Sequence, residues 1–393
     1  MKKIKYLIFV VSLCLFTGCY NYRELNQLGI TSAVGISRTE DGKFELYVQV
    51  MNKQKDSSDT NSSGSSTKFV TYKTKGETVQ EAFRNVILES PRRLYVNHIG
   101  LLIISEDVAR EGLHDVMDLF ARDTEFRKQF YVIISKNSET EEVLSTLTPI
   151  ETLNAKNVKD SIDADHLYLG TTIPVTLEEM LGTYLNDYQD ISLPSVEVVG
   201  NKKKGESTDN LEESMPSAKV VVGPTAVFKE DQLQGYLSKQ EGIAYSFLMN
   251  EISNSILTHE CENGNSASIE VVGSKSSMKA KKGTTKIHID LKSKGNINEI
   301  NCGVDLTKDA EIKKFQTEVG DELQKSISDL IDGVLNKYHS DIFGFEDLLY
   351  KTDPHYFKKL KAQYGDDLLD QLEIEVNVEL QLLTKGNLLK VIQ

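Results

Sequence analysis

The chain has no run of eighteen or more apolar residues, no tryptophan and only four cysteines. A membrane-spanning helix needs about twenty mostly apolar residues. The sequence therefore predicts that no segment of the mature protein spans a membrane. The absence of tryptophan, against 16 tyrosines, does not by itself point to a function.

Basic residues are also in short supply, since 45 lysines and arginines stand against 59 acids and give a net charge of −14. Nucleic-acid-binding surfaces need clustered Lys and Arg, and adhesion to anionic lipid needs a basic patch. The composition argues against both. Length alone suggests two or three domains, and 39% hydrophobic with 26% charged residues is typical of a folded body.

Catalytic motifs are absent as well. The chain contains no Gly-x-x-x-x-Gly-Lys-Ser/Thr phosphate loop, and its GNSAS and GSKSS segments lack the context of a nucleophile elbow. One acidic cluster matches neither an EF-hand nor a zinc pattern and is interpreted as helix-capping aspartates in a solvated loop: Asp160, Asp163, Asp165 and His166. The sequence predicts no enzyme, no metal site and no cofactor.

The N-terminus carries the clearest signal. Three lysines precede an apolar stretch at residues 7–16, which has the length of a signal-peptide core. LFTGC then resembles a bacterial lipobox ending at Cys19, with Phe16 where leucine is usual. On this prediction residues 1–18 are removed, the net charge becomes −17, and Cys19 carries two acyl chains, which anchor a protein stably. The alternative is an ordinary signal peptide followed by a chance cysteine.

Two cysteines remain for the folded body, Cys261 and Cys302. An even pair in an extracytoplasmic protein favours a disulfide. Two free thiols are the alternative, because spatial proximity cannot be read from one sequence.

Alternation and helical periodicity predict an α+β fold with several domains, in which mixed β-sheets carry packed helices. Residues 44–50 alternate as a half-buried strand after an Asp41-Gly42 turn. Apolar strands at 98–105 and 129–135 enclose a helix, which favours a parallel crossover. Three capping boxes are predicted, at Thr78/Glu81, Ser138/Glu141 and Thr176/Glu179. The first opens a helix whose apolar face is Val79, Ala82, Phe83, Val86 and Ile87.

The second half differs in pattern. Strands are predicted at 254–261, 267–280 and 284–301, then a long helix at 308–339 and a final alternating strand at 372–382. The C-terminal domain is therefore expected to be a mostly antiparallel sheet with one long helix.

Composition shifts suggest where the domains divide. We expect an N-terminal α+β domain at 19–147, a middle domain or subdomain at 148–200, and a C-terminal α+β domain at 219–393. Residues 201–218 are charged and contain Gly, Ser and Pro, which is typical of a linker or a long loop.

Arg122 lies beside the strand predicted at 129–135. Arginines in such places usually pair with carboxylates, and Asp123, Glu125 or another nearby acid could serve. A partner-binding patch is the other interpretation.

Several ordered motifs resemble the Ger(x)C family, the C-subunit lipoproteins of bacterial spore germinant receptors. The start GCYNYRELNQLGITSAVGIS is similar to the family's mature N-terminus, with Tyr20 where tryptophan is usual. The segments SPRRLYVNHIGLLIISEDVAREGLHDVMDLFARDTEFR, GPTAVFKEDQLQGYLS, DIFGFED and VNVELQLLTKGNL resemble later family motifs in the same order. The resemblance covers about Cys19 to Leu389.

The resemblance implies a non-enzymatic, lipid-anchored subunit on the outer face of the spore inner membrane. Its partners would be the integral membrane A and B subunits that sense nutrients, and its fold would be α+β in three domains. It implies that Arg23, Glu24 and Leu25 contact a partner, to which Arg122 is added from the residues. The resemblance assigns no germinant-binding site to this chain.

Two other functions remain open. A lipid-anchored extracytoplasmic solute-binding protein would need a cleft between two doubly wound lobes, whereas the second half is predicted to be mostly antiparallel. A lipid-anchored hydrolase would need a nucleophile, a base and an orienting group, and we can name no such set.

We predict that Cys19→Ala releases the protein from the membrane and impairs germination, because the only acyl-chain attachment is lost. Immunoblotting of spore membrane and soluble fractions measures the release. Full retention of the variant in the membrane fraction would contradict the anchor.

Overall fold

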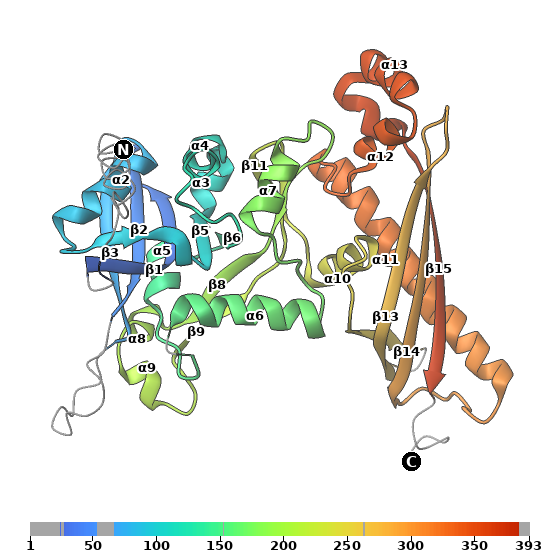
Figure 1. Ribbon diagram of the computed structural model, residues 1–393. Helices are drawn as coiled ribbons and strands as arrows, with labels where there is room; N and C mark the ends of the chain where they lie inside the picture. Colours follow the sequence, from blue (N-terminus) through green and yellow to red (C-terminus); the bar gives the residue numbers. More distant parts are fainter. Residues whose placement is uncertain (1–23, 25–26, 53–66, 152, 262–263, 385–393) are drawn as a thin grey trace, which may run out of the picture.

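The computed structural model describes residues 24, 27–52, 67–151, 153–261 and 264–384, and holds an eight-, a three- and a four-stranded sheet with helices packed on them. The sheets follow one another along the molecule, with the N-terminal sheet and the C-terminal sheet at opposite ends (Figure 1). The predicted α+β fold with mixed sheets and packed helices is confirmed.

The first sheet has the order β3-β2-β1-β5-β6-β8-β9, with β4 paired to the start of β1. The bounds are β1 Leu28–Arg38, β2 Phe44–Met51, β3 Phe69–Gly76, β4 Arg93–Tyr95, β5 Leu101–Ser105, β6 Tyr131–Ser135, β8 Ser195–Gly200 and β9 Ala218–Val222. β1, β5, β6 and β8 run parallel, and antiparallel pairs flank them. All five residues of β5 are buried because helices cover both faces of the sheet.

Alternate residues of β5 show the two layers. Leu102 and Ile104 join the core beneath α2 (Val79–Asn85) and α4 (His114–Arg122), which follows α3 (Glu106–Glu111). Leu101 and Ile103 join the core beneath α5 (Thr140–Ser145) and α6 (Asn154–Tyr168).

Two local predictions in this sheet need correction. α2 ends at Asn85 and continues as a 3₁₀ turn, η2 (Val86–Leu88), so Ile87 turns out to solvent instead of joining the core face. α5 is capped by Glu139 with Glu142, one residue later than expected. The Ser138 hydroxyl instead accepts a hydrogen bond from the Val198 N–H.

The second sheet has the order β11-β10-β7, formed by β7 Ser192–Leu193, β10 Ala226–Lys229 and β11 Gln232–Tyr236. Ala226 and Phe228 of β10 lie in the core of the first sheet, whereas Val227 lies in the C-terminal core, and all three are fully buried. Side chains alternate across a strand, so this short strand is shared by two cores. Before it, α7 (Leu177–Tyr184) has the predicted Thr176/Glu179 capping box.

Residues 201–217 connect β8 to β9, which pair as an antiparallel hairpin. The connection contains α8 (Lys202–Gly205) and α9 (Asp209–Glu212). The Asn210 side-chain amide donates to the carbonyls of Leu147 and Ala218, which ties the connection to the first sheet. The division into domains remains a prediction.

The third sheet has the order β12-β13-β14-β15. β12 (Ser255–Glu260), β13 (Ser266–Ala280) and β14 (Lys286–Ile300) are antiparallel, and β15 (Glu373–Thr384) is parallel to β14. The predicted mostly antiparallel sheet with one long helix is confirmed, since α11 (Asp309–Tyr338) packs across it (Figure 1). α10 (Lys239–Leu248), α12 (Phe345–Thr352), α13 (Pro354–Tyr364) and η4 (Gly365–Gln371) complete this part.

On the open face of this sheet, polar side chains of β14 pair with carboxylates of β15. The parallel register places residues of β14 directly beside residues of β15. The ion pairs are Lys286–Glu373 at 2.6 Å and Lys292–Glu379 at 2.7 Å, and between them His288 Nδ1 lies 2.9 Å from the Glu375 carboxylate. The alternating residues Ile287, Ile289 and Leu291 are buried on the other face.

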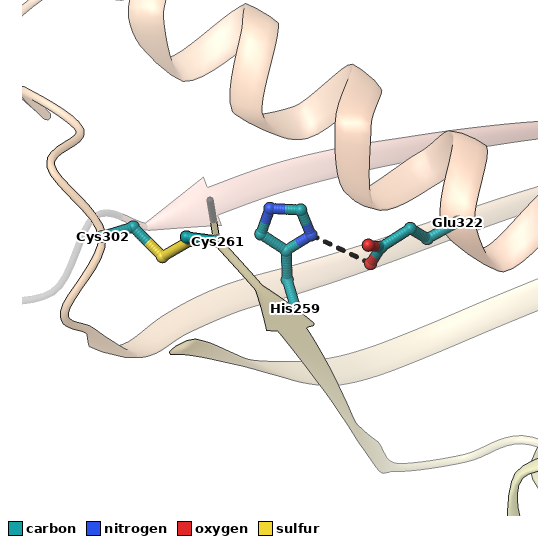
Figure 2. Close-up of a disulfide and its surroundings, with 4 residues drawn as sticks. All are labelled: His259, Cys261, Cys302 and Glu322. Carbon is teal, nitrogen blue, oxygen red and sulfur yellow. Dashed lines mark hydrogen bonds and ion pairs between the residues drawn. A yellow bond between two sulfur atoms is a disulfide. The ribbon is translucent and has the colours of Figure 1, made fainter. Parts of the chain in front are cut away.

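A disulfide joins Cys261, just after β12, to Cys302, just after β14, with Cα atoms 5.9 Å apart (Figure 2). Beside it, His259 Nδ1 lies 2.9 Å from the Glu322 carboxylate of α11, and the His259 ring meets Phe315 edge-on. The covalent link and the histidine contact both hold the end of the sheet beneath the long helix.

We predict that replacing Cys261 and Cys302 by serine lowers the free energy of unfolding by about 4 kcal/mol, because the bond closes a loop of 41 residues. Denaturant unfolding of the oxidised protein and the double variant measures the loss. Thiol titration of the denatured wild-type chain should find neither cysteine free. Two reactive thiols there would contradict the disulfide.

Candidate functional site

Near the N-terminus, three residues expected to matter lie outside the described residues: Cys19, Arg23 and Leu25. Glu24 is exposed, and its carbonyl accepts a hydrogen bond from the Gln27 N–H at 3.0 Å. β1 begins immediately afterwards and runs parallel to β4, with Leu28 beside Arg93. The chain therefore enters the first sheet next to β4.

A groove, which we call the N-terminal groove, lies beside this entry point. It consists of two adjoining hollows that share Arg93, Leu94, Val96 and Glu125, and Leu28 lines one of them. The Arg93 guanidinium pairs with the Glu125 carboxylate at 2.6 Å. Beneath the groove is a cluster of edge-to-face rings: Phe83, Phe120 and Phe126.

One side of this groove carries two exposed apolar residues: Ile87, which the sequence pattern placed on a core face, and Leu88, which the pattern did not indicate. Ile87 and Leu88 of η2 are 67% and 81% exposed. Arg84 and Arg92 flank them in the lining of the groove, and neither side chain has an ion pair among the described residues. We call these four residues the η2 rim. The Ser90-Pro91 pair that ends the helical pattern was the available signal that the preceding turn changes direction.

Arg122 lies on the last turn of α4 with a side chain that is 79% exposed. Its Nε atom lies 2.6 Å from the Asp118 carboxylate, one helical turn earlier. Its partner is therefore another nearby acid, as the sequence allowed, and neither Asp123 nor Glu125. An exposed pair of this kind contributes only about 0.3–0.5 kcal/mol, so Arg122 can exchange Asp118 for another partner at low cost. Its role in partner contact remains a prediction.

The acidic cluster at 160–166 lies on the α6 helix, which corrects our interpretation of a solvated loop. Asp160 pairs with Lys156, and Asp163 pairs with Lys159 and accepts a hydrogen bond from the Tyr131 hydroxyl. Asp165 is buried and accepts hydrogen bonds from the Thr171 hydroxyl and the Thr172 N–H. These carboxylates hold α6 and the turn that follows it.

Across the parts of the chain that the structure describes, no group of three His, Cys, Asp or Glu residues is placed to hold a metal ion. Within the same residues, no helix combines the length and the apolar character needed to cross a bilayer.

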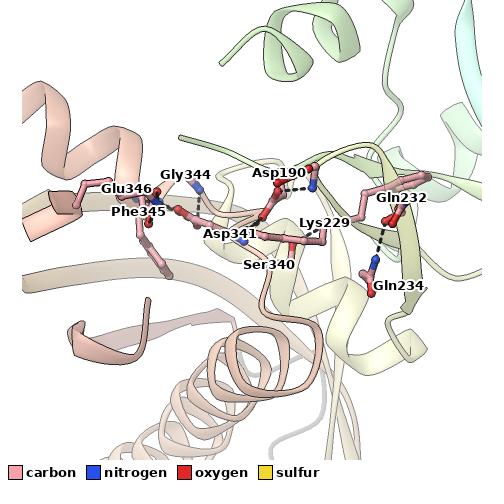
Figure 3. Close-up of polar contacts among 12 residues, drawn as sticks. Asp190, Lys229, Gln232, Gln234, Ser340, Asp341, Gly344, Phe345 and Glu346 are labelled. Atoms are coloured by element: carbon pink, nitrogen blue, oxygen red, sulfur yellow. Dashed lines mark hydrogen bonds and ion pairs between the residues drawn. The ribbon is translucent and has the colours of Figure 1, made fainter. Parts of the chain in front are cut away.

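The strongest polar constellation is a buried junction between the second sheet and the start of α12 (Figure 3). The Asp190 N–H donates to the Asp341 carbonyl at 2.9 Å, and the Asp341 N–H donates to the Asp190 carboxylate at 2.7 Å. Lys229 of β10 lies 3.3 Å from Asp190. The Ser340 hydroxyl donates to the Phe228 carbonyl at 2.6 Å. The junction therefore joins segments about 150 residues apart.

The Asp341 side chain caps the N-terminus of α12. It accepts hydrogen bonds from the N–H groups of Gly344, Phe345 and Glu346 at 2.8–3.0 Å. Burial raises the pKa of Asp341 to about 7, and the nearby carboxylates of Glu346 and Asp190 act in the same direction, whereas the N–H groups oppose the rise. Glu346 is itself buried and paired with Lys361.

Comparison with known proteins matches nearly the whole chain. The family described as "Spore germination protein N-terminal domain" matches residues 21–198. The family described as "Spore germination B3/ GerAC like, C-terminal" matches residues 224–386. Among curated proteins of Bacillus subtilis (strain 168), spore germination protein KC is 27% identical over 96% of this chain and 95% of its own length. Spore germination protein B3 is 20% identical over 97% of this chain and 98% of its own length.

A solved structure supports the fold. The chain titled "Crystal Structure of the GerBC protein" superposes with a TM-score of 0.54 at 17% sequence identity, and the match covers 89% of this chain and 96% of that one.

The junction predicts a pH-dependent stability. Because the pKa of Asp341 is raised from 3.8 to about 7 on folding, the stability from its neutral form is complete below the unfolded value and is lost as pH rises through about 7. Between about pH 5 and about pH 8, the wild type should lose roughly 2–3 kcal/mol relative to Asp341→Asn, whose side chain stays neutral.

Denaturant unfolding of both proteins at the two pH values measures this difference. Asp187→Asn, which removes an exposed carboxyl near Asp190, is the control and should follow the wild type. A constant offset between wild type and Asp341→Asn across the range would contradict the prediction.

Proposed function

The chain belongs to the Ger(x)C family of spore germination proteins, and we propose that it is the lipid-anchored C subunit of a nutrient germinant receptor. In this role it is not an enzyme. It helps assemble the receptor with two integral membrane subunits, A and B, and is needed to trigger germination. It lies on the outer face of the spore inner membrane, held by two acyl chains on Cys19.

The observation that carries the proposal is the match of both family descriptions, in order, over residues 21–198 and 224–386. The lipobox-like sequence before Cys19 supports the membrane attachment. The candidate contacts are surface features, namely Glu24, the N-terminal groove and Arg122, and they lie on the part of the chain that follows the anchor.

The mechanism that we propose is positional. The anchor holds the body at the membrane, and exposed faces dock the A and B subunits. Because β10 contributes to two cores, a displacement at one end of the body would be passed to the other by rigid packing. A signal could then cross the subunit as a shift at its interfaces.

The alternative is a lipid-anchored solute-binding protein. It would need two similar doubly wound lobes around a cleft. The four-stranded C-terminal sheet is antiparallel over three strands and covered by one long helix, which does not favour it.

The test is a pull-down from detergent-solubilised spore membranes with this protein as the tagged bait. We expect a large A-type and a transporter-like B-type polytopic protein to co-purify, and an untagged strain is the background control. Recovery of the bait alone, in mild detergent and with the anchor intact, would contradict the assembly role.

The same assay tests Arg122. We expect Arg122→Glu to lower recovery of the partners roughly tenfold if the residue forms a charge pair across the interface. Arg110→Glu is the matched control, since Arg110 makes a similar pair with Glu106 at 2.6 Å, also one helical turn apart. Equal recovery of the partners with both variants would contradict a place for Arg122 in the interface.

A further inference from the structure

We propose that the η2 rim, formed by Arg84, Ile87, Leu88 and Arg92, lies in the headgroup region of the bilayer that holds the protein. The inference rests on the proposed anchor at Cys19. It goes beyond that anchor because it assigns a second, direct contact between the folded body and lipid, and with it the orientation of the body on the membrane.

The reach of the chain restricts which surface can face the bilayer. Cys19 precedes Leu28, the first residue of β1, by nine residues. A fully extended chain of that length covers about 30 Å. The hydrogen bond from the Gln27 N–H to the Glu24 carbonyl, at 3.0 Å, holds these two residues close together, which shortens the span further. The bilayer surface must therefore lie within about 30 Å of Leu28.

The η2 rim lies at this end of the molecule. Leu28 is beside Arg93 in the β1–β4 pair, and Arg93 lines both hollows of the N-terminal groove. Ile87 lines the hollow that adjoins the one lined by Leu28. α2, which leads into the rim, and the C-terminal sheet lie at opposite ends of the molecule (Figure 1).

The chemistry of the rim suits an interface between water and lipid. Ile87 and Leu88 are adjacent and project from a turn, with exposed fractions of 67% and 81%. Among the other described large apolar residues, Ile150, Leu185 and Met215 are more than 75% exposed but isolated in sequence. The adjacent Leu167, Tyr168 and Leu169 are less exposed, at 46%, 60% and 38%. Arginines extend an apolar stem with a charged end, so Arg84 and Arg92 can reach lipid phosphates while the apolar pair enters beneath them.

Charge on the whole body does not drive this contact. The net charge is −14, and the exposed Glu89 follows Leu88 directly. Insertion of the apolar pair therefore supplies the contact, and the two arginines supply local phosphate partners. This argument favours the lipid surface as the occupant, because the anchor already brings it within reach.

The test places one fluorophore on the full-length, lipid-anchored protein. Leu88→Cys is the test position and Leu185→Cys, which is 78% exposed, is the matched control. Cys261 and Cys302 are joined and Cys19 is acylated in the proposed form, so the introduced thiol is labelled selectively with nitrobenzoxadiazole. The labelled proteins are reconstituted in vesicles of phosphatidylethanolamine and phosphatidylglycerol, with or without nitroxide-labelled acyl chains.

We expect the nitroxide lipid to quench roughly half of the emission at position 88, because inserted side chains reach the boundary of headgroups and acyl chains. Reduction of that label by external dithionite should be slowed. At position 185 the nitroxide lipid should leave the emission unchanged, and external dithionite should reduce the label quickly.

Flotation of the same vesicles separates the two proposals. Protein that floats but shows equal emission and fast reduction at both positions overturns the lipid contact while the anchor stands. Protection from dithionite at position 88 without nitroxide quenching indicates cover by protein and also overturns it. Protein that carries Cys19 and fails to float overturns the anchor and, with it, this inference.

Discussion

One short strand, β10, carries the packing of both halves of the molecule. Ala226 and Phe228 point into the core of the first sheet, and Val227 points into the core beneath α11. Side-chain alternation alone produces this division. Because protein interiors are packed as densely as organic crystals, neither core can shift at β10 without disturbing the other. The middle sheet therefore contributes side chains to the cores on both sides of it.

The polar junction lies beside the same middle sheet. Asp190 and Asp341 exchange hydrogen bonds beside β10, and Lys229 and Ser340 add contacts from each side. Burial of carboxylates costs stability unless donors surround them, and here backbone N–H groups do so. Because hydrogen bonds are directional, these contacts fix the orientation of the start of α12 against the second sheet.

The features that we propose to be functional are on the surface of the protein. Within the described residues, the acids that first suggested a metal site form ion pairs with lysines and accept hydrogen bonds from a tyrosine and threonines. The exposed Arg122, the N-terminal groove and the η2 rim lie on the first half of the chain, where a short segment would connect them to a lipid anchor. A rigid body with candidate contact surfaces near its proposed membrane attachment fits a subunit that positions other proteins.

Local patterns in the sequence were sufficient for much of the fold. The alternation in β14, the 3/4 spacing in α11 and the Thr176/Glu179 capping box depend on neighbours within a few residues, so they could be predicted correctly. At Thr78 only the cap formed, because the Glu81 carboxylate accepts from the Glu77 N–H instead of closing the predicted box. The lipobox-like motif at Cys19 is also local, although its residue lies outside the described ones. Predictions were wrong where a local pattern ended, as at Ile87, whose direction depends on a change from α-helix to a 3₁₀ turn.

Only the tertiary structure decided the contacts between distant segments. The sequence left open whether Cys261 and Cys302 meet, and which nearby acid pairs with Arg122. Nothing near Asp190 indicates Asp341, 151 residues away. By itself the sequence determined most of the elements, though not α6, together with the charge and the family motifs, because these reside in short segments. The shared strand, the junction and the rim depend on how those segments pack, since a contact between distant residues leaves no periodic trace in either one.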